Sequence, residues 1–233
     1  MPAQRTAVQR VAGGGWLALL GGGEFTFGET VEADRAWMAR VGPGAVAFLP
    51  TASGSTEYGD FFAAYLREGF DREVDAVPIF RRRDARRGKN LRRLAAAAAV
   101  YVGGGVTDHL IEALAEEPAL ATLGAKLGEG GVVVAIAAAA QACGVAARSI
   151  ARGAALPGFG WLPGGVVEPN FDPGHDRRLR ELLRAPGAAW GLGIPAGSAI
   201  LLGPERQIEV VGTVFCIEGA EGDVAVLQAS AVP

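Results

Sequence analysis

Residues 131–144 read GVVVAIAAAAQACG, an apolar run that leads into the start of a helix. Many hydrolases place a nucleophilic Ser or Cys on the sharp turn between such a strand and such a helix, with small residues on either side. Here the turn is made of four alanines, residues 137–140, which offer no hydroxyl, thiol or ionisable group. The stretch therefore predicts the frame of a hydrolase without its nucleophile.

Nucleophiles and bases are scarce in the rest of the chain. The only thiols are those of Cys143 and Cys216, and the only imidazoles are those of His109 and His175. These four residues form no disulfide framework and match no spacing typical of metal ligands. We therefore expect no metal site and no cofactor.

A few side chains remain as substitutes for the missing nucleophile and base. Cys143 lies five residues past Ala138, which is more than one helical turn, and a small buried side chain on a helix face is expected there. Ser149 and Ser198 are typical of cap or turn residues. His175 lies in a loop before a helix, where solvation is expected, whereas His109, at a helix start, is a candidate for ligand contact. An active hydrolase with relocated chemistry would combine Cys143 or Ser149 with one of these histidines.

The composition limits the partners of the protein. The chain has 233 residues, of which 50% are hydrophobic, and a formal net charge of -3. Such a chain exerts no long-range attraction on nucleic acid or on an anionic membrane. The basic cluster at residues 81–93 is the local exception, and we expect it to be a solvated loop and helix face. No apolar run is long enough for a signal-peptide core or a membrane span, so a soluble, cytoplasmic protein is expected.

The hydropathy pattern alternates short β-branched runs with longer helical ones, which predicts βαβ units around a parallel sheet. Expected strands are 16–20, 45–49, 74–79, 99–102 and 132–136, and expected helices are 31–41, 58–70, 91–97 and 108–123. Asp75 and Pro78 make 74–79 an edge strand. Either Thr107 or Asp108 is expected to cap the helix that follows them.

The second half of the chain is richer in β structure. Further strands are expected at 166–167, 199–202, 207–211, 214–217 and 224–227, with a hairpin turn at 219–222. No linker or repeat divides the chain, so we expect one domain over residues 1–233. Residues 1–14 would form a flexible tail, and residues 15–230 the α/β domain.

Three of the expected strands end in loops rich in glycine or small polar residues. Because carboxyl ends of parallel strands line the ligand crevice of an open sheet, these loops are candidate binding segments. They contribute Gly23, Glu24, Thr51, Ser53, Gly104, Gly105 and Thr107. None of the loops matches a phosphate-binding glycine motif. Their glycines would instead let a ligand come close to the backbone and would expose amide donors to it.

An ordered set of motifs extends over almost the whole chain, from about residue 16 to residue 227. The set comprises GGGEF (21–25), FLPTAS (48–53), YVGGGVTDHLIEAL (101–114), GVVVAIAAAA (131–140), GFGWLPGGVVEPNFD (158–172), DRRLRELL (176–183) and GLGIPAGSAILL (191–202). In this order and spacing they resemble the cyanophycinase and dipeptidase E family of serine peptidases. The resemblance implies a three-layer α/β fold related to class I glutamine amidotransferases, with a mostly parallel central sheet, helices on both faces and a β-rich C-terminal part.

The resemblance also implies where a catalytic Ser and His would lie. The Ser position falls on Ala138, and the glycines that flank such a Ser become Ile136 and Ala140. Without glycine at those positions, we expect the turn to have relaxed. The position of the catalytic His falls on Asn170. Both the nucleophile that would attack the substrate and the base that would take its proton are therefore replaced.

Acidic residues implied by the same resemblance are also missing. An acidic pair downstream is replaced by Pro195 and Ala196, and residues 147–150, where the acid of the triad is expected, contain none. A serine hydrolase needs an oxygen nucleophile, a base and a group that orients the base. The sequence therefore predicts a catalytically inactive homologue.

The amide groups of an oxyanion hole do not depend on side chains, and we expect them near Gly104–Gly105 and at Ala139. Such a pocket would bind a small acidic peptide or another carboxylate without cleaving it. A homodimer is the expected assembly. Two alternatives remain open: an active peptidase or amidase with relocated chemistry, and a purely structural or oligomerisation partner.

Overall fold

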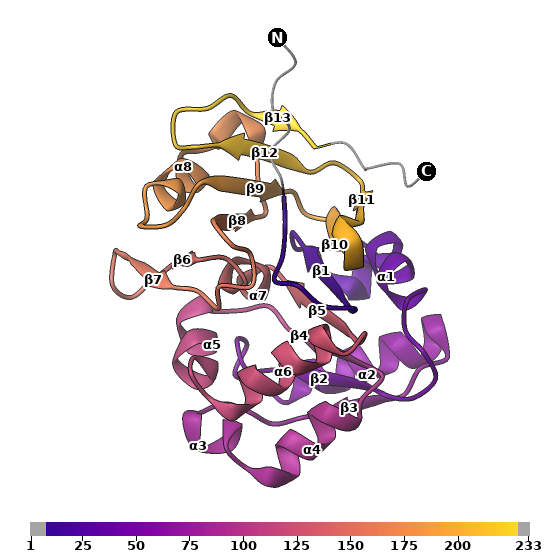
Figure 1. The fold of residues 1–233 in the computed structure, drawn as a ribbon. Coiled ribbons are helices and arrows are strands. Elements are labelled where there is room, and N and C mark those ends of the chain that lie inside the picture. Colours follow the sequence, from indigo (N-terminus) through magenta and orange to yellow (C-terminus); the bar gives the residue numbers. More distant parts are fainter. Residues whose placement is uncertain (1–7, 228–233) are drawn as a thin grey trace.

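The computed structural model describes residues 8–227, and its centre is a sheet of seven strands (Figure 1). The strand order is β11-β10-β1-β5-β4-β2-β3. Their bounds are β1 Trp16–Leu20, β2 Val46–Leu49, β3 Val74–Ala76, β4 Ala99–Val102, β5 Val132–Ile136, β10 Ala199–Leu202 and β11 Ile208–Val211. Strands β1 to β5 run parallel, while β10 and β11 are antiparallel additions at one edge.

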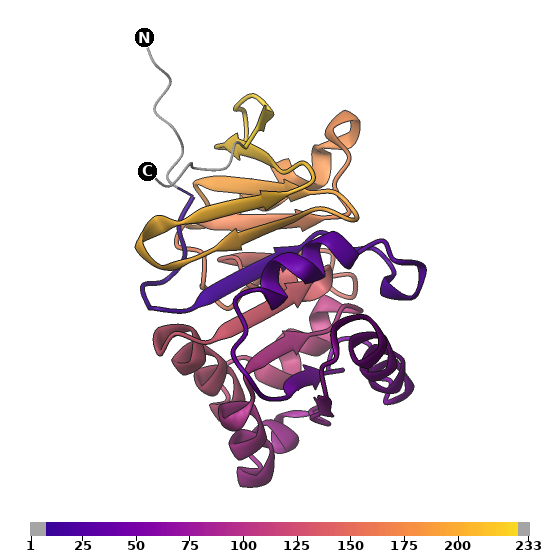
Figure 2. The same cartoon turned by 90° about the vertical axis from the view of Figure 1, so that its right-hand side faces the viewer.

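The central strands are apolar along their entire length because both faces of the sheet are covered. Alternate residues of β1 show this directly: Leu17 and Leu19 enter one core, whereas Ala18 and Leu20 enter the other. Helices α1 (Val31–Met38) and α2 (Glu57–Phe70) cover one face. They contribute Trp37 and Phe62, respectively, whose side chains are fully buried in the core on this face. The two layers of helices lie on opposite sides of the sheet in Figure 2.

The other face is covered by helices that alternate with the parallel strands. These are α3 (Arg82–Ala85), α4 (Gly88–Ala96), α5 (Thr107–Leu114), α6 (Pro118–Gly128) and α7 (Ala138–Ala142). The arrangement is a three-layer α/β sandwich with a mostly parallel sheet, which confirms the fold class expected from the sequence.

A second sheet forms the β-rich C-terminal part. It has the order β13-β12-β9-β8, with bounds β8 Gly165–Pro169, β9 Trp190–Ile194, β12 Phe215–Glu218 and β13 Ala225–Val226. Helix α8 (Arg177–Leu183) packs Leu179, Leu182 and Leu183 into a third apolar cluster against it. The short hairpin β6 (Ala146–Arg148) to β7 (Ala155–Pro157) follows α7, and the 3-10 turns η1 (Phe25–Phe27), η2 (Pro173–His175) and η3 (Pro204–Arg206) complete the chain.

One helix expected from the sequence is two in the structure. The run at 108–123 divides into α5 and α6, because Glu116 has φ 62° and Pro118 is the first residue of α6. Proline disfavours helical backbone in the residue before it, and Glu117 is extended accordingly. The expected cap is also wrong: Val106 is the N-cap residue of α5, and neither Thr107 nor Asp108 caps the helix through its side chain.

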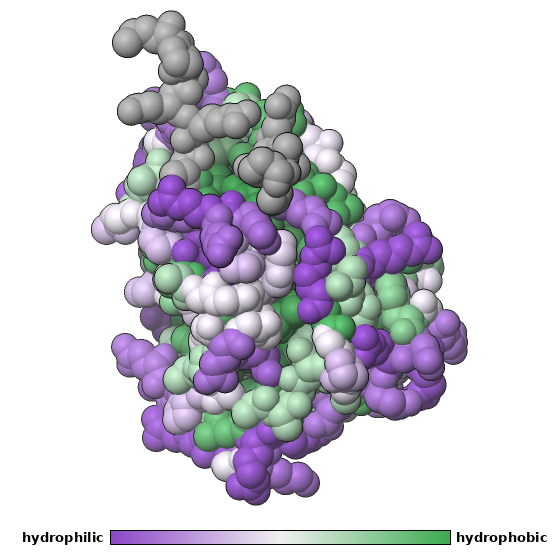
Figure 3. Space-filling model, turned by 45° about the vertical axis from the view of Figure 1, so that its right-hand side comes forward, coloured by the Kyte–Doolittle hydropathy of each residue, from purple (hydrophilic) through white to green (hydrophobic). Residues whose placement is uncertain are grey.

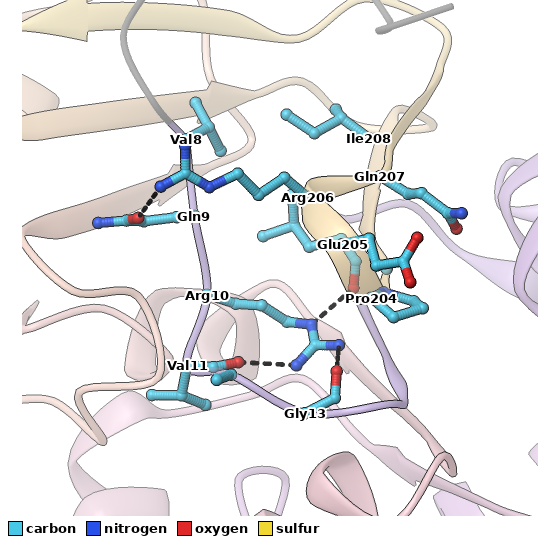
Figure 4. Close-up of a pocket in the computed structure, with 13 residues that line it drawn as sticks. Val8, Gln9, Arg10, Val11, Gly13, Pro204, Glu205, Arg206, Gln207 and Ile208 are labelled. Carbon is cyan, nitrogen blue, oxygen red and sulfur yellow. Dashed lines mark hydrogen bonds between the residues drawn. The ribbon is translucent and has the colours of Figure 1, made fainter. Parts of the chain in front are cut away.

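The flexible tail expected at residues 1–14 does not hold for residues 8–14. Val8 is buried, and the guanidinium of Arg10 donates to the carbonyl oxygens of Leu202 (2.9 Å), Val11 (2.7 Å) and Gly13 (2.9 Å). Figure 4 shows Arg10 beside Val11 and Gly13 in the pocket between this segment and η3. Residues 1–7 of the expected tail lie outside the described residues. Among residues 8–227, the structure holds no helix with the length and apolar character needed to cross a membrane.

Candidate functional site

The turn between β5 and α7 keeps the strained backbone of a nucleophile elbow. Ala137 has φ 51° and ψ -113°, a region that residues with a Cβ rarely adopt. It is partly exposed, whereas Ile136 and Ala138 on either side are buried. The resemblance implied this position at Ala138, and a relaxed turn was expected there. The structure corrects both points, since Ala138 is the first residue of α7 and the strain is retained at Ala137.

The same correction moves the flanking positions. The residues two positions before and two positions after Ala137 are Ala135 and Ala139, both 1% exposed, rather than Ile136 and Ala140. The methyl groups of these alanines fit within the core, so glycine is not needed for the turn to form. Four identical residues in a row gave the sequence no signal to distinguish these registers.

The glycine loop after β4 lies directly beside this elbow. A Cβ built on Gly104 would approach the Cβ of Ala137 to 3.4 Å. Gly105 packs onto the loop after β2, where a Cβ would lie 2.4 Å from the carbonyl oxygen of Ala52. Gly105 also has φ 143°, so close approach and backbone conformation both require glycine there. The expected gathering of strand-end loops is therefore present.

Asn170, which follows a strand of the second sheet, also lies against one of these strand-end loops. It follows β8, and its amide donates to the carbonyl oxygen of Gly21 at 2.8 Å. Its side chain lies over the loop after β1, because a Cβ on Gly22 would be 2.3 Å from Oδ1 of Asn170. Asn170 has φ 49°, which asparagine tolerates better than most residues. The exposed group at this position is thus a neutral amide.

The segment that contains Pro195 and Ala196 packs against the loop that follows β1. The carbonyl oxygens of Ile194 and Pro195 lie 2.2 Å from where a Cβ on Gly21 would be, so only glycine fits at that position. The amide of Gly197 donates to the carbonyl oxygen of Gly22 at 3.0 Å. These contacts are made by backbone and place no carboxylate in the segment.

Backbone amides around Ala137 remain available to a ligand. The amide of Gly103 donates to Leu49 and that of Val106 to Ala52, whereas those of Gly104 and Gly105 donate to no group in the described part of the chain. The first hydrogen bond of α7 is made by Gln141 to Ala137, so the amides that precede it are not used by the helix. With the elbow at Ala137, the amide of the next residue is that of Ala138, not that of Ala139 as expected from the sequence.

The polar side chains expected in the crevice are mostly engaged in local structure. Glu24 accepts from the amide and hydroxyl of Thr26 (3.3 and 3.2 Å), and its own amide donates to Glu29, close to Gly23. Ser53 donates to the carbonyl oxygen of Pro50. Thr51 is buried, and its hydroxyl has no partner among residues 8–227.

A buried polar network, which the sequence did not predict, links α7 to β8 close to the elbow. Gln141 of α7 donates to Glu168 of β8 (Nε2–Oε2 3.1 Å) and accepts from the amide of Arg148 (3.2 Å) and from the hydroxyl of Thr107 (3.3 Å). Glu168 also pairs with the guanidinium of Arg148 at 3.3 Å. Burial raises the pKa of Glu168 above its ordinary value, and Arg148 partly opposes this shift. A single acid within the apolar stretch of β8 was the signal that could have indicated it.

The substitute nucleophiles do not have the surroundings that catalysis needs. Cys143 is 1% exposed, and burial raises the pKa of its thiol far above the ordinary value. Ser149 is buried and donates to Asp108, which also accepts from the amide of Ile150. Ser198 is buried and accepts from the amide of Thr213. All three serve local structure.

The two histidines lie on the surface. His109 is exposed on α5. His175 is 85% exposed in its side chain and contacts Asp172 (Nδ1–Oδ2 2.7 Å). Both His175 and Asp172 line a surface cavity of about 640 Å³ together with Glu168 and Asn170. His175 therefore adjoins the Asn170 position without replacing it. Among residues 8–227, no three His, Cys, Asp or Glu side chains are grouped to hold a metal ion.

Comparison with known proteins finds solved structures of the same fold. The chain is similar over 94% of its length to the crystal structure of a peptidase from an acI-B1 actinobacterium, with 21% identity, a TM-score of 0.76 and 96% of that chain covered. It is similar over 85% of its length to a peptidase E candidate from Listeria monocytogenes EGD-e, with 16% identity, a TM-score of 0.65 and 98% of that chain covered. At these identities the likeness concerns the fold.

No curated protein matches the chain. The family model that describes peptidase family S51 matches residues 17–209, a span that includes the elbow, the glycine loops and Asn170. The chain therefore belongs to peptidase family S51.

Proposed function

We propose that this protein is a non-catalytic member of peptidase family S51, whose crevice binds a small acidic peptide or another carboxylate without cleaving it. The observation that carries the proposal is the pair Ala137 and Asn170. A methyl group stands on the strained elbow, and an amide stands at the position where the resemblance implies the base. A methyl group cannot attack a carbonyl, and a carboxamide cannot accept a proton at neutral pH.

The retained strain supports a role for the crevice beyond folding. A residue with a Cβ in this backbone region costs on the order of 1–3 kcal/mol. Strain persists where the surrounding structure imposes it, and here the strained Ala137 lies against Gly104, whose amide, like that of Gly105, donates to no group within residues 8–227. Amide donors in such an arrangement bind carboxylate or carbonyl oxygen.

Two experiments test the proposal together. In the first, purified protein is incubated with Asp-X dipeptides beside an active family member, and release of free aspartate is measured. No turnover is expected, while turnover that persists after repurification would overturn the proposal.

In the second experiment, calorimetry measures binding of the same dipeptides and of their carboxyl-amidated forms. Binding of the free acids alone is expected. Gly104→Leu should abolish it, because the new side chain would fill the space beside Ala137. Gly124→Leu is the matched control, since nothing lies within 4 Å of a Cβ on this helical glycine.

Assembly as a homodimer, expected from the sequence, is part of the same proposal. Light scattering with and without a bound dipeptide measures it. A stable oligomer that binds no dipeptide would favour the alternative of a purely structural partner.

A further inference from the structure

A dense cluster of cations lies on the two helices between β3 and β4. The exposed cationic side chains of this cluster include Arg82, Arg83, Arg86, Arg87, Lys89 and Arg92, which we call the basic face. Figure 1 places α3 and α4 at the end of the molecule opposite the second sheet, and hydrophilic side chains cover this end in Figure 3. The basic face is therefore separate from the crevice described above.

The carboxylate that neutralises part of this face is buried beneath it. Glu117 accepts two hydrogen bonds from Arg86, at 2.5 Å (Nε) and 2.8 Å (Nη2), and Arg82 lies 3.8 Å away. The side chain of Glu117 is 2% exposed, whereas those of Arg86 and Arg82 are 64% and 57% exposed. The negative charge is thus covered, and the guanidinium groups face the solvent.

Asp84, a residue of α3, repeats this arrangement. Its side chain is 10% exposed and lies 3.3 Å from Arg87 and 3.9 Å from Arg83. Lys89 and Arg92 have no carboxylate within 4.0 Å in the described part of the chain, although Lys89 is near enough to Asp75 to help Arg93 lower the pKa of that carboxyl. Two buried acids therefore pair with four guanidinium groups, beside two cations that form no ion pair within the described residues.

This geometry presents an ordered array of donors outward. Guanidinium is planar and offers donors on more than one edge, so an edge that binds a buried carboxylate leaves another for a second oxygen anion. Holding the side chain in place beforehand reduces the entropy that binding would otherwise cost. The face is suited to several carboxylates or phosphates at once.

The rest of the molecule limits what can bind there. The chain as a whole has a formal charge of -3 although this segment is strongly basic, so the overall field of the protein does not attract a long polyanion. The large apolar side chains that the described residues expose all lie outside the segment, which gives a lipid bilayer nothing to bury. Phe80 is only half-exposed, so bases of single-stranded nucleic acid find no stacking platform.

We propose that the basic face binds a short acidic segment, rich in Asp and Glu, of a partner protein. The carboxylates of that segment would pair with the outer edges of the arginines and with Lys89 and Arg92. This interaction is independent of ligand binding in the crevice.

Fluorescence anisotropy with a labelled peptide of about twelve Asp and Glu residues tests the proposal on the full chain. The wild type should bind it, and raising the salt to about 0.5 M should weaken binding about tenfold, because exposed charges are then screened. The triple variant Arg83→Gln, Lys89→Gln, Arg92→Gln should also bind about tenfold more weakly, since each exposed pair contributes modestly. None of the three leaves Glu117 without its partner.

The matched control is Arg35→Gln, Arg67→Gln, Arg184→Gln. It removes the same charge from arginines that are 64%, 60% and 57% exposed on other helices or at their ends, and it should bind like the wild type. Equal weakening by both triple variants would overturn the proposal, as would equal binding of a peptide of Asn and Gln. Tighter binding of a DNA duplex of similar charge would also overturn it, because the face would then be a nucleic-acid surface.

Discussion

The amides of Ala137 and Asn170 donate to the carbonyl oxygens of two consecutive residues at the end of β1. Ala137 bonds to Leu20 at 2.9 Å, and Asn170 bonds to Gly21 at 2.8 Å. Two positions far apart in sequence are therefore held side by side by the central strand. A nucleophile and a base would need such proximity, and the frame keeps it although neither side chain can perform the reaction.

Replacing Ala137 alone should not create a hydrolase. Ala137→Ser would place a hydroxyl on the elbow, but Asn170 cannot remove its proton. We expect no hydrolysis of Asp-X dipeptides by this variant and no labelling by a fluorophosphonate. The double variant Ala137→Ser, Asn170→His should be labelled with loss of fluoride, and mass spectrometry should detect the added mass on the peptide that contains residue 137. Labelling of the single variant would show that another base reaches the elbow.

The position of the strained residue can be measured through stability. Ala137→Gly should raise the free energy of unfolding by about 1 kcal/mol, because glycine adopts positive φ without the Cβ penalty. For a chain of this size the melting temperature should rise by about 2–4 °C. Ala138→Gly should do the reverse, since Ala138 is helical and glycine costs about 1 kcal/mol there. If instead Ala138→Gly raised the free energy of unfolding and Ala137→Gly lowered it, the elbow would lie at Ala138.

Cys143 should be unreactive in the native protein. Its thiol is buried and donates to the carbonyl oxygen of Ala139 at 3.3 Å, and its pKa is raised, so the thiolate is absent near neutral pH. We expect no modification of the Cys143 peptide by iodoacetamide at about pH 8, slightly below the ordinary pKa of a thiol, and full modification in guanidinium chloride. Native modification at the rate of a free thiol would contradict the burial and reopen relocated catalysis.

Two buried glutamates should affect stability with opposite pH dependence. Burial raises the folded-state pKa of Glu168, so its ionisation opposes folding as the pH rises above the unfolded value. Relative to the wild type, Glu168→Gln should therefore gain stability as the pH rises above about 4, the ordinary pKa of a glutamate.

Glu117 provides the contrast, because Arg86 lowers its folded-state pKa. The ionised carboxylate stabilises the protein above the unfolded pKa, and this contribution is lost as the pH falls through the folded-state value. Glu117→Gln should therefore lose stability relative to the wild type near neutral pH and recover it in acid. Denaturant unfolding of both variants across this range measures the slopes, and equal slopes would contradict the assignment.

The segment at residues 8–13 should contribute to stability through Arg10. Arg10→Gln removes charged hydrogen bonds to the carbonyl oxygens of Leu202, Val11 and Gly13, each of which then lacks its donor. We expect a loss of about 2 kcal/mol and a melting temperature lower by about 4–8 °C. Arg206→Gln, in the same pocket, is the control, because within residues 8–227 the side chain of Arg206 makes only a 3.5 Å hydrogen bond with Gln9 (Figure 4). Equal effects of the two changes would show that Arg10 does not anchor the segment.

The amino-acid sequence alone determined most of the central sheet. Apolar runs of four or five residues bounded by glycine or alanine placed β1, β4 and β5 at their observed bounds, because strands buried on both faces have no polar alternation to confuse them. The sequence also determined that the elbow lacks a nucleophile, since no register of four alanines supplies one.

Tertiary structure decided which alanine takes the elbow. Residues 137–140 are chemically identical, so no local preference distinguishes them. The hydrogen bond from Ala137 to Leu20 does, because it continues the pairing of β5 with β1 and forces the turn at that residue. Pairings between distant residues likewise decided the partners of Glu168 and Glu117, because the sequence around these acids gives no sign of either partner. Such contacts depend on which segments the fold brings together, and no local pattern encodes that.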